Sequence, residues 1–403
     1  MQLDLFTKEH NEDHLEELFQ AYFDCRKKKR KTINALKFEH HFEQEIFRLH
    51  EEIISQKYKP KQSIAFIVNK PVQREIFAAD FRDRIVHHFL IRKLNPFFES
   101  QFIHDSYACR VGKGTHYGVR RIDEFIKKCS QIYTQDCYVL KLDIQGFFLN
   151  INKDLLIEML KSFLDNKYCF NDREFLFSLI KKVVMNNPAT NCIIKGKKSD
   201  WDGLPKNKSL FHSPKGCGLP IGNLTSQVFA NFYMDKFDHY IKHHLGIRYY
   251  GRYVDDFVVV HEDKSYLKNL ISTLGNFLNN ELQLTLHPKK IYLQHYSKGV
   301  PFLGTMIKPG RIYIGKRTKS NFYQVIQKQN AIVKNRKPTN EEQVAFQSSM
   351  NSYLGIMKHY NTYKLRKKML WKNLSPHWWN HVYMSGGYAK FVLKKRKAES
   401  NNV

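Results

Sequence analysis

The chain has 403 residues, 42% of them hydrophobic, so it can bury a large core and form two or three lobes. Its 66 lysines and arginines outnumber 38 acidic residues, and the net charge of +28 predicts a polyanionic partner, with nucleic acid as the first candidate. Seven scattered cysteines without a C-x-x-C pair indicate neither a zinc site nor a disulfide framework. No apolar stretch resembles a membrane span or a signal peptide, so we expect a cytoplasmic protein without membrane contact.

The N-terminal part of the chain has a helical pattern followed by strands. Residues 12–57 place apolar side chains on one helical face, interrupted by the basic block 26–31. That block is either a phosphate-contacting patch or a solvated helix end. Residues 66–77 predict a pair of strands with basic residues near its tip, and a helix should start at Asp80. Helices are then expected near 116–129, 153–165 and 172–186.

The C-terminal half starts with a break in this alternation. Residues 187–217 are rich in Asn, Pro, Gly and Lys, which predicts a long loop that is functional or mobile. Beyond residue 310 the chain is basic, and Thr339 with Glu342 forms a capping box in front of an apolar helical face. The basic tail 394–403 should fray. The pattern as a whole is α+β.

Three aspartates are the strongest chemical signal. Asp255 and Asp256 stand between the apolar stretches 247–250 and 257–260, so we expect both at the tip of a hairpin. Asp143 ends the apolar strand 138–142. Carboxylates without neighbouring Cys or His favour Mg²⁺, and a two-metal site of this kind catalyses phosphoryl transfer. An ordinary solvated turn is the alternative for the aspartate pair alone.

The order of the motifs resembles the fingers, palm and thumb of reverse transcriptases over most of residues 60–370. The motifs are the strand ending in Asp143, the segment 218–227, the aspartate hairpin, and the segments 286–290 and 300–304. Ile221 and Gln227 stand where most of the family has Gln and Pro. These two residues, together with the segments 106–110 and 112–115, resemble the enzymes of the diversity-generating retroelement branch.

The resemblance implies an α+β right-hand polymerase fold with fingers, a palm containing an antiparallel sheet, and a helical thumb. It predicts a helical basic arm over 1–58, fingers and palm over 59–310 with a loop insertion at 187–217, and a thumb with a basic extension over 311–403. The metal ligands would be Asp143, Asp255, Asp256 and the backbone carbonyl of Ile144. They would hold two Mg²⁺ ions, for which Mn²⁺ could substitute.

The resemblance also implies roles at the substrate. Arg74, with Lys70 and Arg110 as weaker candidates, would bind the incoming triphosphate, although each could be a plain surface charge. Phe148 would be the steric gate against a ribose hydroxyl or a core aromatic, while the backbone of Gly146 and Phe147 approaches the phosphates. The remaining candidates are Ile221 and Gln227 at the nascent base pair, Lys290 or Lys289 as general acid, and Gly304 in the primer grip.

The implied activity is RNA-directed DNA synthesis from template RNA and dNTPs, with cDNA as the product. A retroelement enzyme would need a small basic accessory protein or partner subunit, whereas an antiphage defence enzyme would copy a non-coding RNA. An RNA polymerase and a non-catalytic, RNA-binding, maturase-like protein are further alternatives. Trp371, Trp378 and Trp379 could stack on bases, although such residues are more often core anchors.

Overall fold

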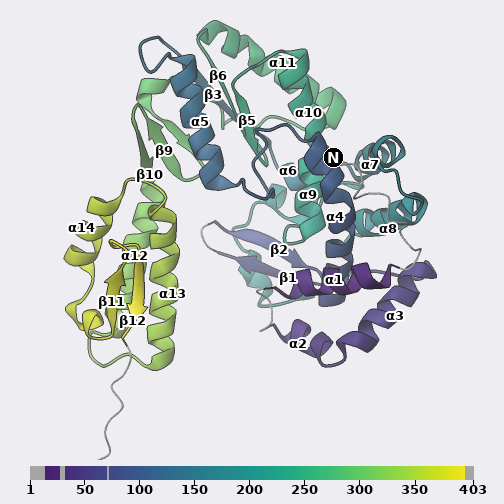
Figure 1. Ribbon diagram of the computed structural model, residues 1–403, viewed down its shortest axis with the longest axis horizontal. Coiled ribbons are helices and arrows are strands. Elements are labelled where there is room, and N and C mark those ends of the chain that lie inside the picture. Colours follow the sequence, from purple (N-terminus) through teal and green to yellow (C-terminus); the bar gives the residue numbers. More distant parts are fainter. Residues whose placement is uncertain (1–13, 28–31, 70–71, 395–403) are drawn as a thin grey trace, which may run out of the picture. The chain divides into compact units, whose positions relative to one another are not determined.

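The computed structural model describes residues 14–27, 32–69 and 72–394. Lys70, most of the basic block 26–31 and the tail beyond 394 lie outside the described residues. Helices and strands are mixed along the described chain, and the sheets contain antiparallel pairs (Figure 1). None of the described helices is both long and apolar enough to cross a membrane.

The chain forms two compact units. The first unit consists of the residues up to 114 together with 141–259 and 265–292. The second consists of 115–140, 260–264 and the residues from 293 onward. The domain boundaries expected at 58/59 and 310/311 stay predictions.

Three N-terminal helices of the first unit pack against one another and against a long fourth helix. They are α1 (Leu15–Arg26), α2 (Ile33–Glu39) and α3 (Phe42–Ile54), and the fourth is α4 (Phe81–Gln101). The buried Tyr22 ring on α1 stacks on Phe42 and meets the ring edge of Phe81. Helix α4 starts where expected, because the Asp80 carboxylate accepts a hydrogen bond from the Arg82 amide.

A small sheet in the first unit has the strand order β2-β1-β4. Strands β1 (Ser63–Val68) and β2 (Arg74–Ala78) are antiparallel, which confirms the predicted strand pair. Strand β4 (Cys192–Ile194) adds a parallel edge to β1. β4 belongs to the segment expected to be a loop, so a distant part of the chain completes this sheet.

The segment 187–217, which we call the insertion, is therefore more ordered than the sequence predicts. It contains β4 and the short 3-10 helices η1 (Lys198–Trp201), η2 (Lys206–Lys208) and η3 (Leu210–His212). The buried carboxylate of Glu75 on β2 accepts hydrogen bonds from the Trp201 indole (2.7 Å), the Ser209 hydroxyl (2.7 Å) and the Leu210 amide (2.5 Å). These contacts span more than 120 positions, so local composition carries no sign of them.

The rest of the first unit surrounds the hairpin of the two aspartates. The expected helices α7 (Lys153–Lys167) and α8 (Arg173–Met185) are present and pack together. Other helices of this part are α6 (Phe147–Asn150), α9 (Leu224–Tyr233), α10 (Asp235–His239) and α11 (Lys264–Leu282). A four-stranded sheet has the order β5-β6-β3-β7, with β5 (Tyr250–Tyr253), β6 (Asp256–His261), β3 (Tyr138–Asp143) and β7 (Tyr292–His295). Residues 138–140, 260–261 and 293–295 of these strands are assigned to the second unit. Strand β5 begins at Tyr250 and not at Ile247 as expected, because the Ile247 amide donates back to the Ile241 carbonyl instead of to a neighbouring strand.

The second unit combines a sheet, helices and a hairpin. Its sheet has the order β10-β9-β8, from β8 (Val300–Phe302), β9 (Thr305–Lys308) and β10 (Arg311–Ile314), and α5 (Thr115–Cys129) packs on β9. Helices α12 (Lys316–Ile332), α13 (Asn340–Met357) and α14 (Tyr363–Asn373) follow, and the predicted capping box of Thr339 and Glu342 opens α13. A final hairpin of β11 (Val382–Ser385) and β12 (Lys390–Leu393) was not predicted (Figure 1).

The tryptophans of the second unit have different environments. Trp378 is completely buried, stacks on Phe346 and donates to the Gln329 carbonyl, so it is a core anchor. Trp371 is 61% exposed and stacks on Trp379. The base-stacking prediction is therefore reduced to Trp371 and Trp379.

We predict that Glu75→Gln loosens the insertion. The amide keeps one acceptor oxygen and turns an NH₂ group toward at least one of the three donors, so the free energy of unfolding should fall by about 1–3 kcal/mol. Limited proteolysis should then cut within 187–217 faster than in the parent protein. Asp202→Asn, the same change at an exposed position of the insertion, is the control. Equal proteolysis of the two variants would contradict the anchoring role of Glu75.

Candidate active site

The aspartate hairpin has a tighter turn than the sequence suggests. Tyr253 pairs with Asp256, so Asp256 is the first residue of β6 and only Val254 and Asp255 form the turn. Val254 has a φ of 57°, a left-handed conformation that is unfavourable for a β-branched residue. Its carbonyl accepts a hydrogen bond from Nη1 of Arg252 at 3.0 Å, which holds the turn in this conformation.

Arg252 lies at the centre of a buried network beneath the hairpin. Its Nε and Nη2 donate to both carboxylate oxygens of Asp238 on α10, at 2.7 and 2.5 Å. Nη1 also donates to Oδ1 of Asn231 on α9 at 2.9 Å, and the Tyr250 hydroxyl donates to Asp238. Burial opposes the charge of Arg252, but the attraction and hydrogen bonds of Asp238 together with the charges of Tyr250 and Asp235 outweigh burial and raise the Arg252 pKa. This fork-shaped contact ties β5 to two helices.

The sequence analysis missed this network. An arginine within the otherwise aromatic strand 250–253 is the one local signal, because a buried guanidinium needs an acid. The identity of that acid, Asp238, depends on how α10 packs beneath the strand.

Asp143 lies at the end of β3 and has a basic partner. Its carboxylate Oδ1 is 2.8 Å from Nζ of Lys290, and its backbone carbonyl accepts from the His287 amide. A second lysine, Lys141, lies 3.3 Å from Oδ1 of Asp256. Lys290 was a predicted site residue, whereas Lys141 was not.

The three predicted carboxylates act on one another electrostatically. Burial and the negative charges of Asp143 and Asp256 raise the pKa of Asp255 to about 6, although Lys290 opposes this. Burial also raises the pKa of Asp256, against the attraction of Lys141. The two lysines therefore leave part of the negative charge uncompensated.

This charge distribution fits a divalent cation. Among the described residues, no group of three Asp, Glu, His or Cys side chains forms a metal cage as it stands. The ammonium groups of Lys290 and Lys141 instead occupy one oxygen each of Asp143 and Asp256, as cations would. Hard carboxylate oxygens with excess negative charge are the donors that Mg²⁺ prefers. Ile144, the predicted carbonyl ligand, is buried in a bridge to Leu286.

The turn after Asp143 holds the predicted nucleotide-site residues. Gly146 has a φ of 56°, a conformation that suits glycine, and α6 begins at Phe147. The rings of Phe147 and Phe148 meet edge to face with centroids 5.4 Å apart, so Phe148 is braced by a buried neighbour. The Phe148 carbonyl accepts from the Leu219 amide, which ties this turn to the segment 218–227.

The other predicted residues have varied surroundings. The Ile221 carbonyl accepts from the Phe77 amide at 2.9 Å, and Gln227 Oε1 lies 3.3 Å from the Cys109 sulfur. Arg74 is exposed on β2. Arg110 is turned into the protein, where its Nε pairs with Glu99 and its Nη1 donates to two backbone carbonyls. Its role at the triphosphate stays a prediction that these contacts do not favour.

Gly304 belongs to the second unit. It has a φ of 80° in the turn between β8 and β9, and its carbonyl accepts from the Gly315 amide at 2.9 Å. The structure thus explains the glycine by backbone conformation, and its role in a primer grip stays a prediction.

Comparisons with known proteins identify the family of this chain. Residues 60–307 match the family model of reverse transcriptase, described as an RNA-dependent DNA polymerase. Protein YkfC of Escherichia coli (strain K12) is 22% identical over 290 residues, which cover 64% of this chain and 69% of YkfC. The COX1/OXI3 intron 2 protein of Saccharomyces cerevisiae is 17% identical over 307 residues, 62% of this chain but only 32% of the yeast protein.

Solved structures give weaker similarities. A Candida albicans telomerase in complex with a fragment of telomeric RNA has a TM-score of 0.46 and 11% identity, over 84% of this chain and 62% of that one. An apo telomerase of Candida tropicalis, truncated from its C-terminal domain, has a TM-score of 0.44 and 12% identity, over 65% of this chain and 58% of that one.

The family model spans more than half of the chain and includes all three aspartates. Together with the mixed helices and antiparallel sheets, it confirms the predicted right-hand polymerase fold. The chain therefore belongs to the reverse transcriptase family.

Proposed function

We propose that this protein is an RNA-directed DNA polymerase that makes cDNA by two-metal nucleotidyl transfer. The observation that supports this most is the grouping of Asp143, Asp255 and Asp256, because burial and the charges of Asp143 and Asp256 raise the pKa of Asp255 to about 6. Bound Mg²⁺, or Mn²⁺ in its place, would activate the attacking hydroxyl and stabilise the leaving pyrophosphate. The carboxylates and the Ile144 carbonyl would hold the two ions.

The residues around the aspartates have roles that match this chemistry. Lys290, whose Nζ lies 2.8 Å from Asp143, is placed at the acids and would protonate the pyrophosphate. Phe148, braced by Phe147, would form a wall against the 2′-hydroxyl and so select dNTPs. Arg74 would pair with the triphosphate through its planar guanidinium. The net charge of +28 would support binding of template RNA and cDNA.

The biological role is a second part of the proposal. The segment 218–227, with Ile221 and Gln227, supports a diversity-generating retroelement with a template RNA and a small basic accessory protein. An antiphage defence enzyme that copies a non-coding RNA is the alternative. Sequencing the RNA and cDNA that copurify with the protein separates the two, because a retroelement template carries a repeat of the diversified gene.

We predict that Asp255→Asn abolishes DNA synthesis but spares RNA binding. Loss of a ligand to the metal ions should raise the activation free energy by about 4 kcal/mol or more, which corresponds to a rate decrease of about 10³-fold. The measurement is dNTP incorporation on a primed RNA, with rNTPs tested in parallel. Asp165→Asn at a half-exposed position is the control. A biological effect that survives Asp255→Asn would favour the non-catalytic, maturase-like alternative.

We predict that Arg252→Lys also removes activity, although it changes no aspartate. A lysine cannot make the two-pronged contact to Asp238 and reach Val254, so the free energy of unfolding should decrease by about 2–4 kcal/mol. Urea unfolding and polymerisation below the unfolding transition are the two measurements. The exposed Arg248→Lys is the matched control. Full activity of the folded Arg252→Lys protein would show that the network does not position the hairpin.

We predict that Ile221→Gln raises copying accuracy at template adenines. A glutamine would restore hydrogen bonds that hold the nucleotide and template in register. If these bonds favour the correct nucleotide over a wrong one by about 1 kcal/mol, the error rate should fall by about fivefold. Sequencing of cDNA from a defined template measures this. An error spectrum identical to that of the parent would overturn the fidelity hypothesis.

A further inference from the structure

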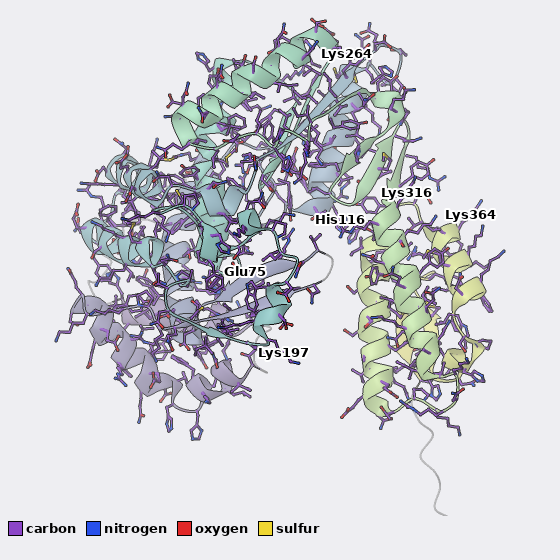
Figure 2. The ribbon with its side chains drawn as sticks, turned by 180° about the vertical axis from the view of Figure 1, so that it is seen from behind. Glu75, His116, Lys197, Lys264, Lys316 and Lys364 are labelled. Carbon is purple, nitrogen blue, oxygen red and sulfur yellow. The ribbon has the colours of Figure 1, made fainter. Side chains whose placement is uncertain are left out.

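The insertion 187–217 is fixed at a definite place in the first unit. Besides the three hydrogen bonds to Glu75, the side-chain amide of Gln73 donates to the backbone carbonyls of Asp200 and Asp202. Leu210 is buried in a core cluster with Phe77 of β2 and Leu149 of α6. Figure 2 labels Glu75 on β2 and Lys197 in the insertion. The insertion is thus bound both to the small sheet and to the helix that follows the Asp143 turn.

This attachment brings η2 to the predicted nucleotide site. A Cβ atom on Gly146 would lie 3.5 Å from the backbone oxygen of Asn207, the central residue of η2. Gly146 belongs to the turn between Asp143 and Phe148. Lys206 and Lys208 therefore flank a residue whose backbone oxygen faces that turn.

The insertion carries more positive charge than its own acids compensate. It has six lysines and two aspartates, and one of these, Asp200, accepts a hydrogen bond from the Lys197 amide. Lys206 and Lys208 are exposed, and within the part of the chain that the structure describes neither side-chain ammonium group has a hydrogen-bond or ion-pair partner. Two unpaired ammonium groups at this turn would attract a polyanion.

We propose that Lys206 and Lys208 bind phosphate oxygens of the incoming nucleoside triphosphate. This inference rests on the proposed polymerase function and adds an element to it, because a lysine-bearing turn of the insertion would close one side of the nucleotide site. The triphosphate is favoured over template phosphates by the position of η2. The backbone oxygen of Asn207 faces Gly146, and Glu75, which anchors the insertion, follows the exposed Arg74 in the sequence of β2.

The first test is kinetic. Lys206→Gln with Lys208→Gln should raise the KM for dNTP about tenfold and leave kcat within about twofold, because the contacts orient the triphosphate rather than the reacting atoms. Lys197→Gln with Lys198→Gln is the matched control, since it removes the same charge from the same insertion at η1 and its preceding residue. The affinity for primed template and its salt dependence should be equal in both variants.

The second test does not depend on turnover. Acetylation of surface lysines by an N-hydroxysuccinimide ester, followed by mass spectrometry, should show Lys206 and Lys208 protected when the next dNTP is added to the protein with primed template. Lys197 and Lys198 should react equally with and without dNTP. If the parent protein made no DNA, the proposed function would fail, yet this protection would still report on nucleotide binding.

Three results would overturn the inference. The first is an unchanged KM for dNTP together with unprotected lysines. The second is an equal increase in KM in both double variants, which would indicate a diffuse charge effect. The third is a loss of template affinity with a normal KM, which would assign the two lysines to the nucleic-acid backbone.

Discussion

The buried contact between Arg252 and Asp238 is the interaction on which the candidate active site depends. A guanidinium and a carboxylate that are both fully buried must satisfy each other, because neither charge can be solvated in the core. The same guanidinium holds the Val254 carbonyl and thereby fixes a turn that a β-branched residue would otherwise avoid. Asp255 belongs to this turn and Asp256 follows it directly, so their positions are set from beneath by a pair that takes no part in the proposed chemistry.

Above this network, the hairpin concentrates negative charge that the protein alone does not neutralise. Lys290 and Lys141 each contact one carboxylate, yet the Asp255 pKa remains near 6. Burial and repulsion between the carboxylates both disfavour the charged form of Asp255, and active sites often retain such unfavourable charge arrangements. We propose that the insertion adds positive charge for the nucleotide. Lys206 and Lys208 flank Asn207, whose backbone oxygen faces Gly146, and the Glu75 contacts anchor the insertion.

Features that arise from neighbouring residues could be predicted from the sequence. The strand pair 66–77, the helix start at Asp80 and the capping box at Thr339 follow from alternation, caps and turn-forming residues, and the structure confirms them. The strand and short helices within the insertion, and the hairpin after residue 380, were not predicted. Strand β4 is only three residues long and is formed by pairing with a strand more than a hundred positions away, so its local pattern is no stronger than that of a loop.

By itself, the sequence determined the family to which this protein belongs and predicted its chemistry, because acids at strand ends and the order of motifs can be followed along the chain. Only the tertiary structure decided which side chains surround the predicted site. Arg252 looks like an ordinary charge until α10 places Asp238 beneath it, and the pairing of Arg110 with Glu99 is likewise absent from the local sequence pattern. Burial and long-range pairing separate a structural charge from a functional one, and neither is encoded in a short stretch of residues.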